Sequence, residues 1–303
     1  MDRLAEIEAL VAVVECGTFS AAGERLGLAK SVISRRVSRL EQRLGSRLVH
    51  RTTRRLSLTD AGRRFYERAV QILADLDDAE QGVSSANTEL RGTLKVAAPL
   101  SFGLAHLSSA LTGFLERHPA IEVTLDLNDR NINLVEEGFD VAVRIGELQD
   151  STLVARRLSI SRMVTCASRA YLERHGEPLH PNDLHRHIGL QYSNISYKQH
   201  WQFVSRDGKT FQAQPQIRIR ANNGEVLACA AVAGMGITTG PTFILGPYLK
   251  EGKLQRILRD YLRPSLGIFA VTPPGRLLPQ RVQRFIEFLS SRFGDQPYWD
   301  EPM

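Results

Sequence analysis

The amino-acid sequence predicts an α/β protein: an N-terminal winged helix-turn-helix with a long linker helix, followed by a larger C-terminal α/β region. Three observations predict this class. The first sixty residues hold short helical patterns separated by glycines, residues 60–86 hold one unbroken apolar stripe, and strand and helix patterns alternate from Thr93 onwards. The length of 303 residues is enough for two domains with hydrophobic cores of their own.

The composition is that of an ordinary globular protein, with 43% apolar and 24% charged residues. No apolar run is long enough to cross a bilayer, and the mixed-charge start lacks the apolar core of a signal peptide, so we expect a cytoplasmic protein without membrane contact. The three cysteines lie far apart in the chain, which excludes a disulfide framework and a zinc-binding spacing. We therefore expect no metal and no cofactor.

Two helices are expected at the N-terminus. Apolar residues recur at helical spacing over residues 3–16, and Gly17 follows in a position suited to a left-handed helix end. Ser20 is a favourable N-cap residue for a short second helix over residues 21–26, and Gly27 supplies the turn after it. A third helix after this turn would complete a helix-turn-helix.

The third helix is expected to begin at Ser31 as its N-cap and to end at Leu44, before Gly45. Its core stripe consists of Ile33, Val37, Leu40 and Leu44. Its opposite face consists of Ser31, Ser34, Arg35, Ser38, Arg39 and Gln42. Arginine pairs with guanine edges, serine fits close to the DNA backbone or a base, and Val32 suits a thymine methyl, so this helix is a candidate for the major groove. The alternative is a three-helix bundle with a solvated basic surface.

Basic charge is concentrated on this motif. Residues 25–68 hold thirteen Arg/Lys against three acids, so this segment is +10 and the rest of the chain is −4 for a total of +6. Residues 47–50 and 56–58 are expected to be two strands around a basic turn at 51–55, which makes a wing whose arginines lie along phosphates or enter a narrow minor groove. The candidate DNA-binding residues are Ser20, Lys30, Ser31, Val32, Ser34, Arg35, Arg36, Arg39, Arg51, Thr52, Arg54 and Arg55.

One long helix is expected to open at Thr59 and Asp60 and to run to residue 86. The apolar positions at steps of three and four are Phe65, Ala69, Ile72, Leu76, Ala79 and Val83. At 1.5 Å per residue the helix is roughly 40 Å long, which is more than a small winged domain covers, so the stripe favours pairing of two subunits. Packing of the helix on its own domain is the alternative.

Strands and helices alternate through the remaining two-thirds of the chain. Strands are expected at 94–98, 121–127, 139–143, 161–166, 188–192, 217–220, 236–239 and 266–272. Helices are expected at 104–117, 131–137, 225–233 and 279–293. This alternation favours a mostly parallel sheet with helices on its faces.

Five motifs occur in a fixed order between residues 19 and 62, within a match to a known pattern that runs without gaps over residues 4–62. They are Phe19-Ser20-Ala21-Ala22, Ser34-Arg35-Arg36-Val37, Leu40-Glu41-Gln42-Arg43-Leu44-Gly45, Arg51-Thr52-Thr53-Arg54 and Leu58-Thr59-Asp60-Ala61-Gly62. Their content and order resemble the signature of LysR-type transcriptional regulators. Two positions depart from the pattern. Val49 replaces a usual phenylalanine, which should affect packing only, and Lys30 replaces a neutral polar residue at the start of the reading helix, which is expected to alter operator preference.

The C-terminal region resembles the effector domain of the same family more loosely, most closely over residues 222–240 and 252–254. The resemblance implies two α/β lobes that enclose a cleft, as in periplasmic solute-binding proteins. Lobe one would hold residues 93–160 and 267–303, and lobe two residues 161–266. The expected organisation is a DNA-binding domain at 1–59, a linker and dimerisation helix at 60–87, a hinge at 88–92 and a regulatory domain at 93–303.

The resemblance implies a sequence-specific DNA-binding transcriptional regulator, not an enzyme, whose activity is modulated by a small-molecule effector between the lobes. The implied partners are double-stranded DNA with a two-fold-related operator, an effector of anionic or polar character, RNA polymerase, and further copies of the chain as a homodimer, a tetramer or a larger assembly. A ligand in the cleft would change how the subunits sit on DNA.

Candidate effector-binding residues lie where strands meet helices or loops. Ser101 ends a strand and opens a helix, so that its hydroxyl and nearby amides would hold a carboxylate, with a simple N-cap as the alternative. Hydroxyls at Thr238 and Thr239 suggest a polar ligand. The candidate set is Ser101, Phe102, Arg144, Ile145, Gly146, Tyr192, Ser193, Thr238 and Thr239.

Other interpretations are weaker. The glycines at 234, 236 and 240 imitate a dinucleotide motif, but the third is one residue late and a helix precedes them instead of a strand. A histidine group at 175–187 lies in a Pro-rich loop with mixed spacing, so a solvated loop is favoured over a metal site. Cys166 and Cys229 lie in apolar stretches and are expected to be buried thiols. Two other functions are alternatives for this chain. A solute-binding or transport component is disfavoured because we find no signal-peptide pattern and because the N-terminal region is basic, and an α/β enzyme is disfavoured because we find no convergent set of catalytic residues.

Overall fold

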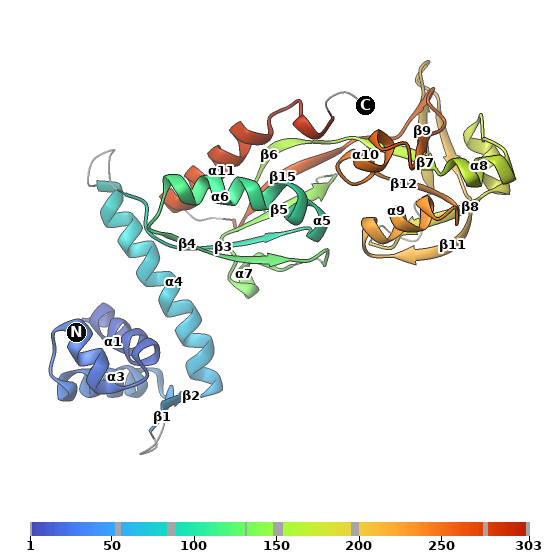
Figure 1. Ribbon diagram of the computed structural model, residues 1–303. Coiled ribbons are helices and arrows are strands. Elements are labelled where there is room, and N and C mark those ends of the chain that lie inside the picture. The colour runs from blue at the N-terminus through green and yellow to red at the C-terminus, as the bar shows by residue number, and fades with distance from the viewer. Residues whose placement is uncertain are drawn as a thin grey trace. The chain divides into compact units, whose positions relative to one another are not determined.

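The computed structural model describes residues 2–51, 56–83, 89–130, 132–147, 154–194, 200–274 and 278–300. The chain divides into two compact units, residues 1–92 and residues 93–303 (Figure 1). Each unit has its own hydrophobic core. No helix within these ranges is both long enough and apolar enough to span a membrane.

The first unit is a three-helix head with a two-stranded wing and a long helix. Its elements are α1 (Arg3–Cys16), α2 (Phe19–Leu26), α3 (Lys30–Leu44), β1 (Val49–Arg51), β2 (Leu56–Leu58) and α4 (Asp60–Val83). The two strands are antiparallel, with Val49 opposite Leu58. These elements agree with the sequence prediction in type and order, but β1 begins two residues later than the strand expected at 47–50 and includes Arg51, which was expected in the turn. The expected extension of the long helix to residue 86 and the hinge to residue 92 fall in part on residues 84–88, which lie outside the described residues.

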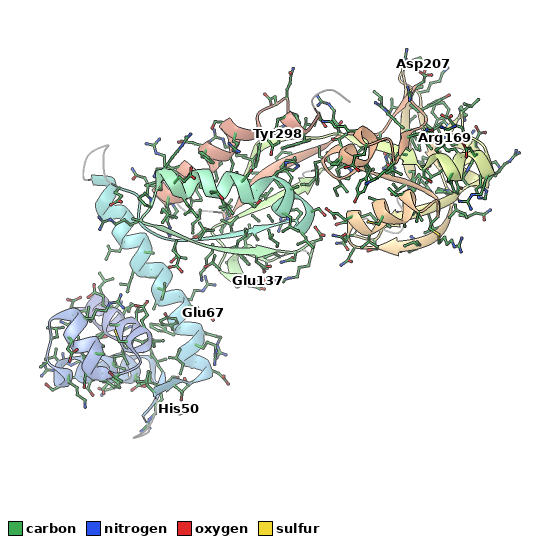
Figure 2. The ribbon with its side chains drawn as sticks, in the orientation of Figure 1. His50, Glu67, Glu137, Arg169, Asp207 and Tyr298 are labelled. Atoms are coloured by element: carbon green, nitrogen blue, oxygen red, sulfur yellow. The ribbon has the colours of Figure 1, made fainter. Side chains whose placement is uncertain are left out.

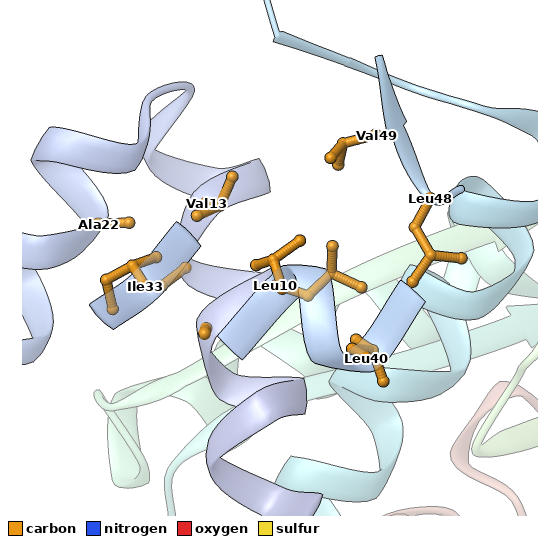
Figure 3. Packing of buried hydrophobic residues seen from close by; sticks show 10 residues of the cluster. Leu10, Val13, Ala22, Ile33, Leu40, Leu48 and Val49 are labelled. Atoms are coloured by element: carbon orange, nitrogen blue, oxygen red, sulfur yellow. The ribbon is translucent and has the colours of Figure 1, made fainter. Parts of the chain in front are cut away.

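The core of the head brings apolar side chains of α1, α2, α3 and β1 together (Figure 3). Leu10, Ile33 and Leu40 are fully buried there. Leu44, which the sequence placed in the same stripe, is instead 38% exposed, because α3 ends there and the core lies further back along the helix. The stripe on α3 is therefore one turn shorter than expected.

The helix caps of the head differ from those expected. Thr18, not Ser20, caps α2, since its hydroxyl accepts the Ala21 amide at 3.1 Å, and Ser20 lies inside the first turn. Helix α3 begins at Lys30 after Ala29, whose carbonyl accepts the Val32 amide at 2.8 Å, so Ser31 is a helical residue and not the cap. The glycines that close α1, α2 and α3 all have left-handed backbones, as expected.

In its described residues, the second unit contains two five-stranded sheets and one three-stranded sheet. Lobe one is built on the order β4-β3-β5-β15-β6, and lobe two on β11-β8-β12-β7-β13 with β10-β9-β14 beside it. The strands are β3 (Gly92–Ala98), β4 (Ile121–Leu127), β5 (Val141–Gly146), β6 (Val154–Ser161), β7 (Met163–Ala167), β8 (Ile188–Tyr192), β9 (Trp201–Ser205), β10 (Thr210–Ala213), β11 (Gln216–Ala221), β12 (Ile237–Pro241), β13 (Gln255–Arg256), β14 (Tyr261–Leu262) and β15 (Leu266–Thr272).

The prediction of mostly parallel sheets is wrong. Strands β3 and β5 are parallel, but β15 is antiparallel to both β5 and β6. In lobe two, β8 is parallel to β11 and β12, whereas β7 is antiparallel to β12 and β13. The reason is the double crossing between lobes: β6 carries the chain out of lobe one and β15 brings it back, so these two strands run in opposite directions (Figure 1).

The helices of the second unit flank the sheets. They are α5 (Leu100–Phe102), η1 (Gly103–Leu107), α6 (Ser108–Arg117), α7 (Leu134–Glu137), α8 (Arg169–His175), η2 (Pro181–Arg186), α9 (Gly224–Val232), α10 (Thr242–Lys250), α11 (Gln280–Phe293) and η3 (Tyr298–Asp300). The helix expected from residue 104 begins four residues earlier and passes through the π-helical turn η1. The helix expected at 131–137 is reduced to the single turn α7.

Candidate functional site

The outer face of α3 carries a row of cations that have no acidic partner among the residues that the structure describes. Ile33, Val37 and Leu40 fix the inner face of the helix, each with no exposed area. Most of the α3 candidates are exposed, namely Lys30, Ser31, Arg35 and Arg39, whereas Val32, Ser34 and Arg36 are half-buried. Ser20 is exposed on α2.

Acidic residues of the head form ion pairs with other arginines and not with the cations on the outer face of α3, as far as the described residues show. Arg43 pairs with the buried Glu6 at 3.2 Å, and Arg25 pairs with Glu15. Within the described part of the chain, no ion pair reaches Arg35 or its neighbours Lys30, Arg36 and Arg39. An exposed, uncompensated positive face of this kind attracts a polyanion such as the DNA backbone.

The wing is held against α3 by one carboxylate. Glu41 on α3 accepts the backbone amides of Leu48 at 2.8 Å and Val49 at 3.2 Å. Thr59 caps α4 by accepting the Gly62 amide at 2.9 Å, and its hydroxyl donates to the Arg47 carbonyl at 2.8 Å. These bonds fix both strands of the wing relative to α3.

Gly62 is required where α4 passes the wing. A Cβ atom at this position would lie 1.9 Å from the carbonyl oxygen of Leu48, far closer than two such atoms can approach. His50 stands on the exposed side of β1 (Figure 2). The wing tip with Thr52, Arg54 and Arg55 lies outside the described residues, as does the side chain of Arg51.

The second unit has a cleft of about 430 Å³ between its two lobes, within the size range of small-molecule sites. Six of the nine candidate effector residues line it: Ser101, Arg144, Ile145, Tyr192, Thr238 and Thr239. The cleft brings together both lobes and the segment that connects β14 to β15.

Three candidates are not among the lining residues that the structure describes. Phe102 is fully buried in an aromatic cluster, and Gly146 and Ser193 lie next in the chain to lining residues. Arg144, Ile145 and Gly146 belong to β5 itself and do not follow it, because that strand runs three residues beyond its expected end. Arg144 donates to the carbonyl of Ile132 at 2.8 Å.

Ser101 is already engaged by a carboxylate of the other lobe. Its hydroxyl donates to Glu225 of α9 at 2.5 Å, which links lobe one to lobe two. Asp129 lies close by: burial and the charge of Glu225 raise its pKa, while a backbone hydrogen bond from Leu100 lowers it. Burial and the charge of Asp129 raise the pKa of Tyr192 to about 12. An effector carboxylate at Ser101 would meet these two carboxylates, so the expected anion contact at this helix end lacks electrostatic support.

An aromatic cluster joins the lobes beside the cleft, and we call it the interlobe aromatic cluster: Phe102, His106, Phe243, Phe293, Tyr298 and Trp299. The Phe102 ring of lobe one meets the Phe243 ring of lobe two edge-on, with 5.5 Å between their centres. Tyr298 and Trp299 belong to η3, the turn after α11 (Figure 2).

Two polar contacts of η3 reinforce this cluster. Asp300 pairs with Arg162, at the point where the chain crosses to lobe two, at 2.5 Å. His106 Nδ1 lies 2.7 Å from the Tyr298 hydroxyl, and burial lowers the pKa of His106 to about 4. The turn therefore contacts both lobes.

The sequence analysis missed several cleft residues. Asp129 lines the cleft, and Glu225 lies next to it through its contact with Ser101. Neither has a strong sequence signal, since each is one of many acids at the start or end of an element. Arg263 lines the cleft from the connection between β14 and β15. Cys229, expected to be buried, is exposed on α9, whereas Cys166 is buried and its pKa is raised to about 12 by that burial. The apolar stretch around Cys229 packs through its neighbours, which leaves the thiol outside.

Two family models match the chain. The bacterial regulatory helix-turn-helix protein, lysR family, matches residues 4–63, and the LysR substrate binding domain matches residues 87–294. An uncharacterized HTH-type transcriptional regulator of Haemophilus influenzae is 37% identical over 282 residues, which cover 93% of this chain and 98% of that protein. The HTH-type transcriptional regulator CrgA of Neisseria meningitidis serogroup C is 35% identical, over 96% of this chain and 97% of its own.

Full-length structures of regulators of this kind are also similar. The structure of CrgA, a LysR-type regulator from Neisseria meningitidis, has 34% identity and a TM-score of 0.60 over 96% of this chain and 98% of that one. The full-length Vibrio cholerae virulence activator AphB has 27% identity and a TM-score of 0.59 over 94% and 98%. Since the matches extend over both units, the chain belongs to the LysR family of DNA-binding transcriptional regulators, with a helix-turn-helix head and an effector-binding domain.

Proposed function

We propose that this regulator reads base edges with residues 31–39 of α3 and contacts the DNA backbone or minor groove with residues 51–55. The observation that carries this proposal is the exposed row of cations on α3, which has no acidic partner within the described residues. The pairing of Arg25 with Glu15 and of Arg43 with Glu6 supports it further, because these two arginines of the head are neutralised by acids whereas those on the outer face of α3 are not.

The functional unit in this proposal is a homodimer that joins through α4. Phe65 of the apolar stripe packs on the core of the head and Ala69 is buried, whereas Ile72 further along α4 is 47% exposed. A helix whose stripe continues beyond its own core suits pairing with a second copy. Two reading helices would then lie on a two-fold-related operator. Assembly into tetramers or larger forms and contact with RNA polymerase are further parts of the proposal.

The regulatory part of the proposal places a small-molecule effector in the cleft of the second unit. The cleft is bordered by both lobes, so a ligand there would favour one lobe arrangement over another and alter operator binding by its differential affinity. The proposal keeps the expected organisation: residues 1–59 bind DNA, residues 60–87 form the linker and dimerisation helix, residues 88–92 are a hinge, and residues 93–303 form the regulatory domain.

A gel-shift titration of the full chain against fragments of its own genome tests the DNA-binding part. We expect one or a few fragments to bind tightly in an excess of competitor DNA, and sedimentation of the complex to show an even number of chains. Equal affinity for all fragments would contradict sequence-specific binding, and a single chain per operator would contradict the dimer.

A further inference from the structure

Arg263 is a cation of the cleft wall whose guanidinium is largely buried. It lies between β14 and β15, where the chain returns from lobe two to lobe one. Its guanidinium carbon is 5.7 Å from the centre of the Phe203 ring, and Phe203 is fully buried in β9. Among the described residues, Nε and Nη1 of Arg263 have no hydrogen-bond partner, although both atoms are buried.

An unpaired buried guanidinium is costly, because an ionised group leaves water and gains no compensating bond. Burial lowers the pKa of Arg263 to about 10, which still leaves it protonated at neutral pH. The other arginines of the cleft differ in this respect. Arg130 pairs with Glu137 and Asp126, and Arg144 donates to a backbone carbonyl. Arg263 is therefore the cleft cation with unused hydrogen-bonding capacity in the part of the chain that the structure describes.

A second polar group of the cleft wall is also buried without a hydrogen-bond partner among the described residues. This group is the Thr239 hydroxyl on β12. Many other lining residues are apolar, including Met163, Trp201 and Leu266. Within the part of the chain that the structure describes, the cavity thus combines apolar wall residues with a cation and a hydroxyl whose buried polar atoms lack hydrogen-bond partners.

We propose that Arg263 is the anchor for the carboxylate of the effector, and that the effector is a small monocarboxylate with an apolar body. This inference rests on the proposed effector site and deepens it. The planar fork of a guanidinium matches a carboxylate through two parallel hydrogen bonds, and the Thr239 hydroxyl adds a donor. A monoanion is favoured over a dianion because the same cleft carries Asp129 and the neighbouring Glu225, whose charges oppose further negative charge.

The test uses the full chain with benzoate and hexanoate as probes, and with benzamide and hexanamide as their uncharged counterparts. We expect the carboxylates to raise the melting temperature of the second unit and the amides to leave it unchanged, since a ligand that binds the folded state stabilises it. Inorganic phosphate is the comparison anion. A larger effect of phosphate than of either carboxylate, an equal effect of acid and amide, or no effect of any anion would overturn the assignment.

Variants locate the contact. Calorimetry should show that Arg263→Met weakens carboxylate binding about ten- to a hundredfold, with Arg263→Lys between the two, as expected for a charged hydrogen-bonding pair. The matched control is Arg169→Met, which removes the same charge from an exposed residue that pairs with Glu173 and is not among the cleft-lining residues, and it should leave binding unchanged. Equal losses in the two methionine variants would show a general charge effect and refute a specific anchor.

The melting temperature of Arg263→Met without ligand tests independently whether the guanidinium has a binding role or a structural role. Methionine keeps the apolar stem beside Phe203 and removes the unpaired charge, so we expect the variant to melt at the same or a higher temperature than the parent. A lower melting temperature would show that the guanidinium has a structural role. Gel shifts on the same samples separate the two proposals. If the parent does not bind DNA sequence-specifically, the regulator proposal is refuted. If it does bind but no anion has an effect, only the assignment of Arg263 as the carboxylate anchor is refuted.

Discussion

Replacement of Glu41 by alanine should loosen the wing while it leaves the three helices of the head folded. The carboxylate accepts two backbone amides, those of Leu48 and Val49, and both residues are at most 2% exposed. Without Glu41 these amides would be buried and unsatisfied. At about 1–2 kcal/mol for each, toward the lower end of the range for charge-assisted bonds, the local opening free energy of the wing should fall by about 2–4 kcal/mol.

Hydrogen exchange measures this effect directly, because amide protection reports local opening. We expect the Leu48 and Val49 amides to exchange roughly 30- to 1000-fold faster in Glu41→Ala, from the same energies. Amides of α1 should keep their protection, since the Leu10–Ile33 core is intact. Glu41→Gln is the matched control, because its amide oxygen retains one acceptor and should restore part of the protection.

The DNA affinity of the same variants links this local change to function. A loosened wing pays an ordering cost on binding, so Glu41→Ala should bind DNA more weakly than Glu41→Gln at every salt concentration. Unchanged exchange at Leu48 and Val49 in the alanine variant would refute the reasoning, whatever the DNA affinity.

Three further predictions follow from the head and the interlobe aromatic cluster. Arg35→Ala should relax base preference at one operator position by about 1–3 kcal/mol, whereas Arg54→Ala should weaken binding to all sequences and reduce the salt slope by about 1 in gel shifts; equal effects would contradict the division into reading and positioning residues. Burial lowers the pKa of His106 to about 4, so the contribution of the neutral imidazole to stability is present above its ordinary pKa of 6.5 and is lost as pH falls through 4. The melting temperature of His106→Gln should therefore fall less steeply in acid than that of the parent, and an equal slope would count against this. Trp299→Ala should destabilise the second unit by about 3–5 kcal/mol in denaturant titrations and Trp299→Phe by less; a neutral alanine variant would show that the cluster does not hold the lobes.

The elements of the head were predictable because their signals are local. Glycines follow each of the three helices, and apolar spacing fixes the inner faces of α1 and α3. The N-cap residues of these helices were harder to predict. Ser20 and Thr18 are both good cap residues, and only the path of the preceding turn decides that Thr18 meets the free amide. Ser31 fails as a cap for the same reason.

The second unit was predicted less completely because much of it depends on distant contacts. Strand β6 carries two consecutive arginines and no clean alternation, so its place beside β15 is set by pairing over more than a hundred residues of sequence. The hairpin β9–β10 and the short β13 and β14 were missed as well. Strand ends pointed correctly to six cleft-lining residues, whereas Arg263 lies in a connection whose burial depends on Phe203, sixty residues earlier.

The placement of the tryptophans gives the molecule built-in optical reporters. The chain contains two: Trp201 lines the cleft and donates to Gln191 at 3.0 Å, and Trp299 lies in the interlobe aromatic cluster. Single-tryptophan variants would therefore give separate emission signals for ligand entry and for movement between the lobes. If the two signals change together during a titration, occupancy and lobe rearrangement are one event; if they separate in time, their order can be read without any attached dye.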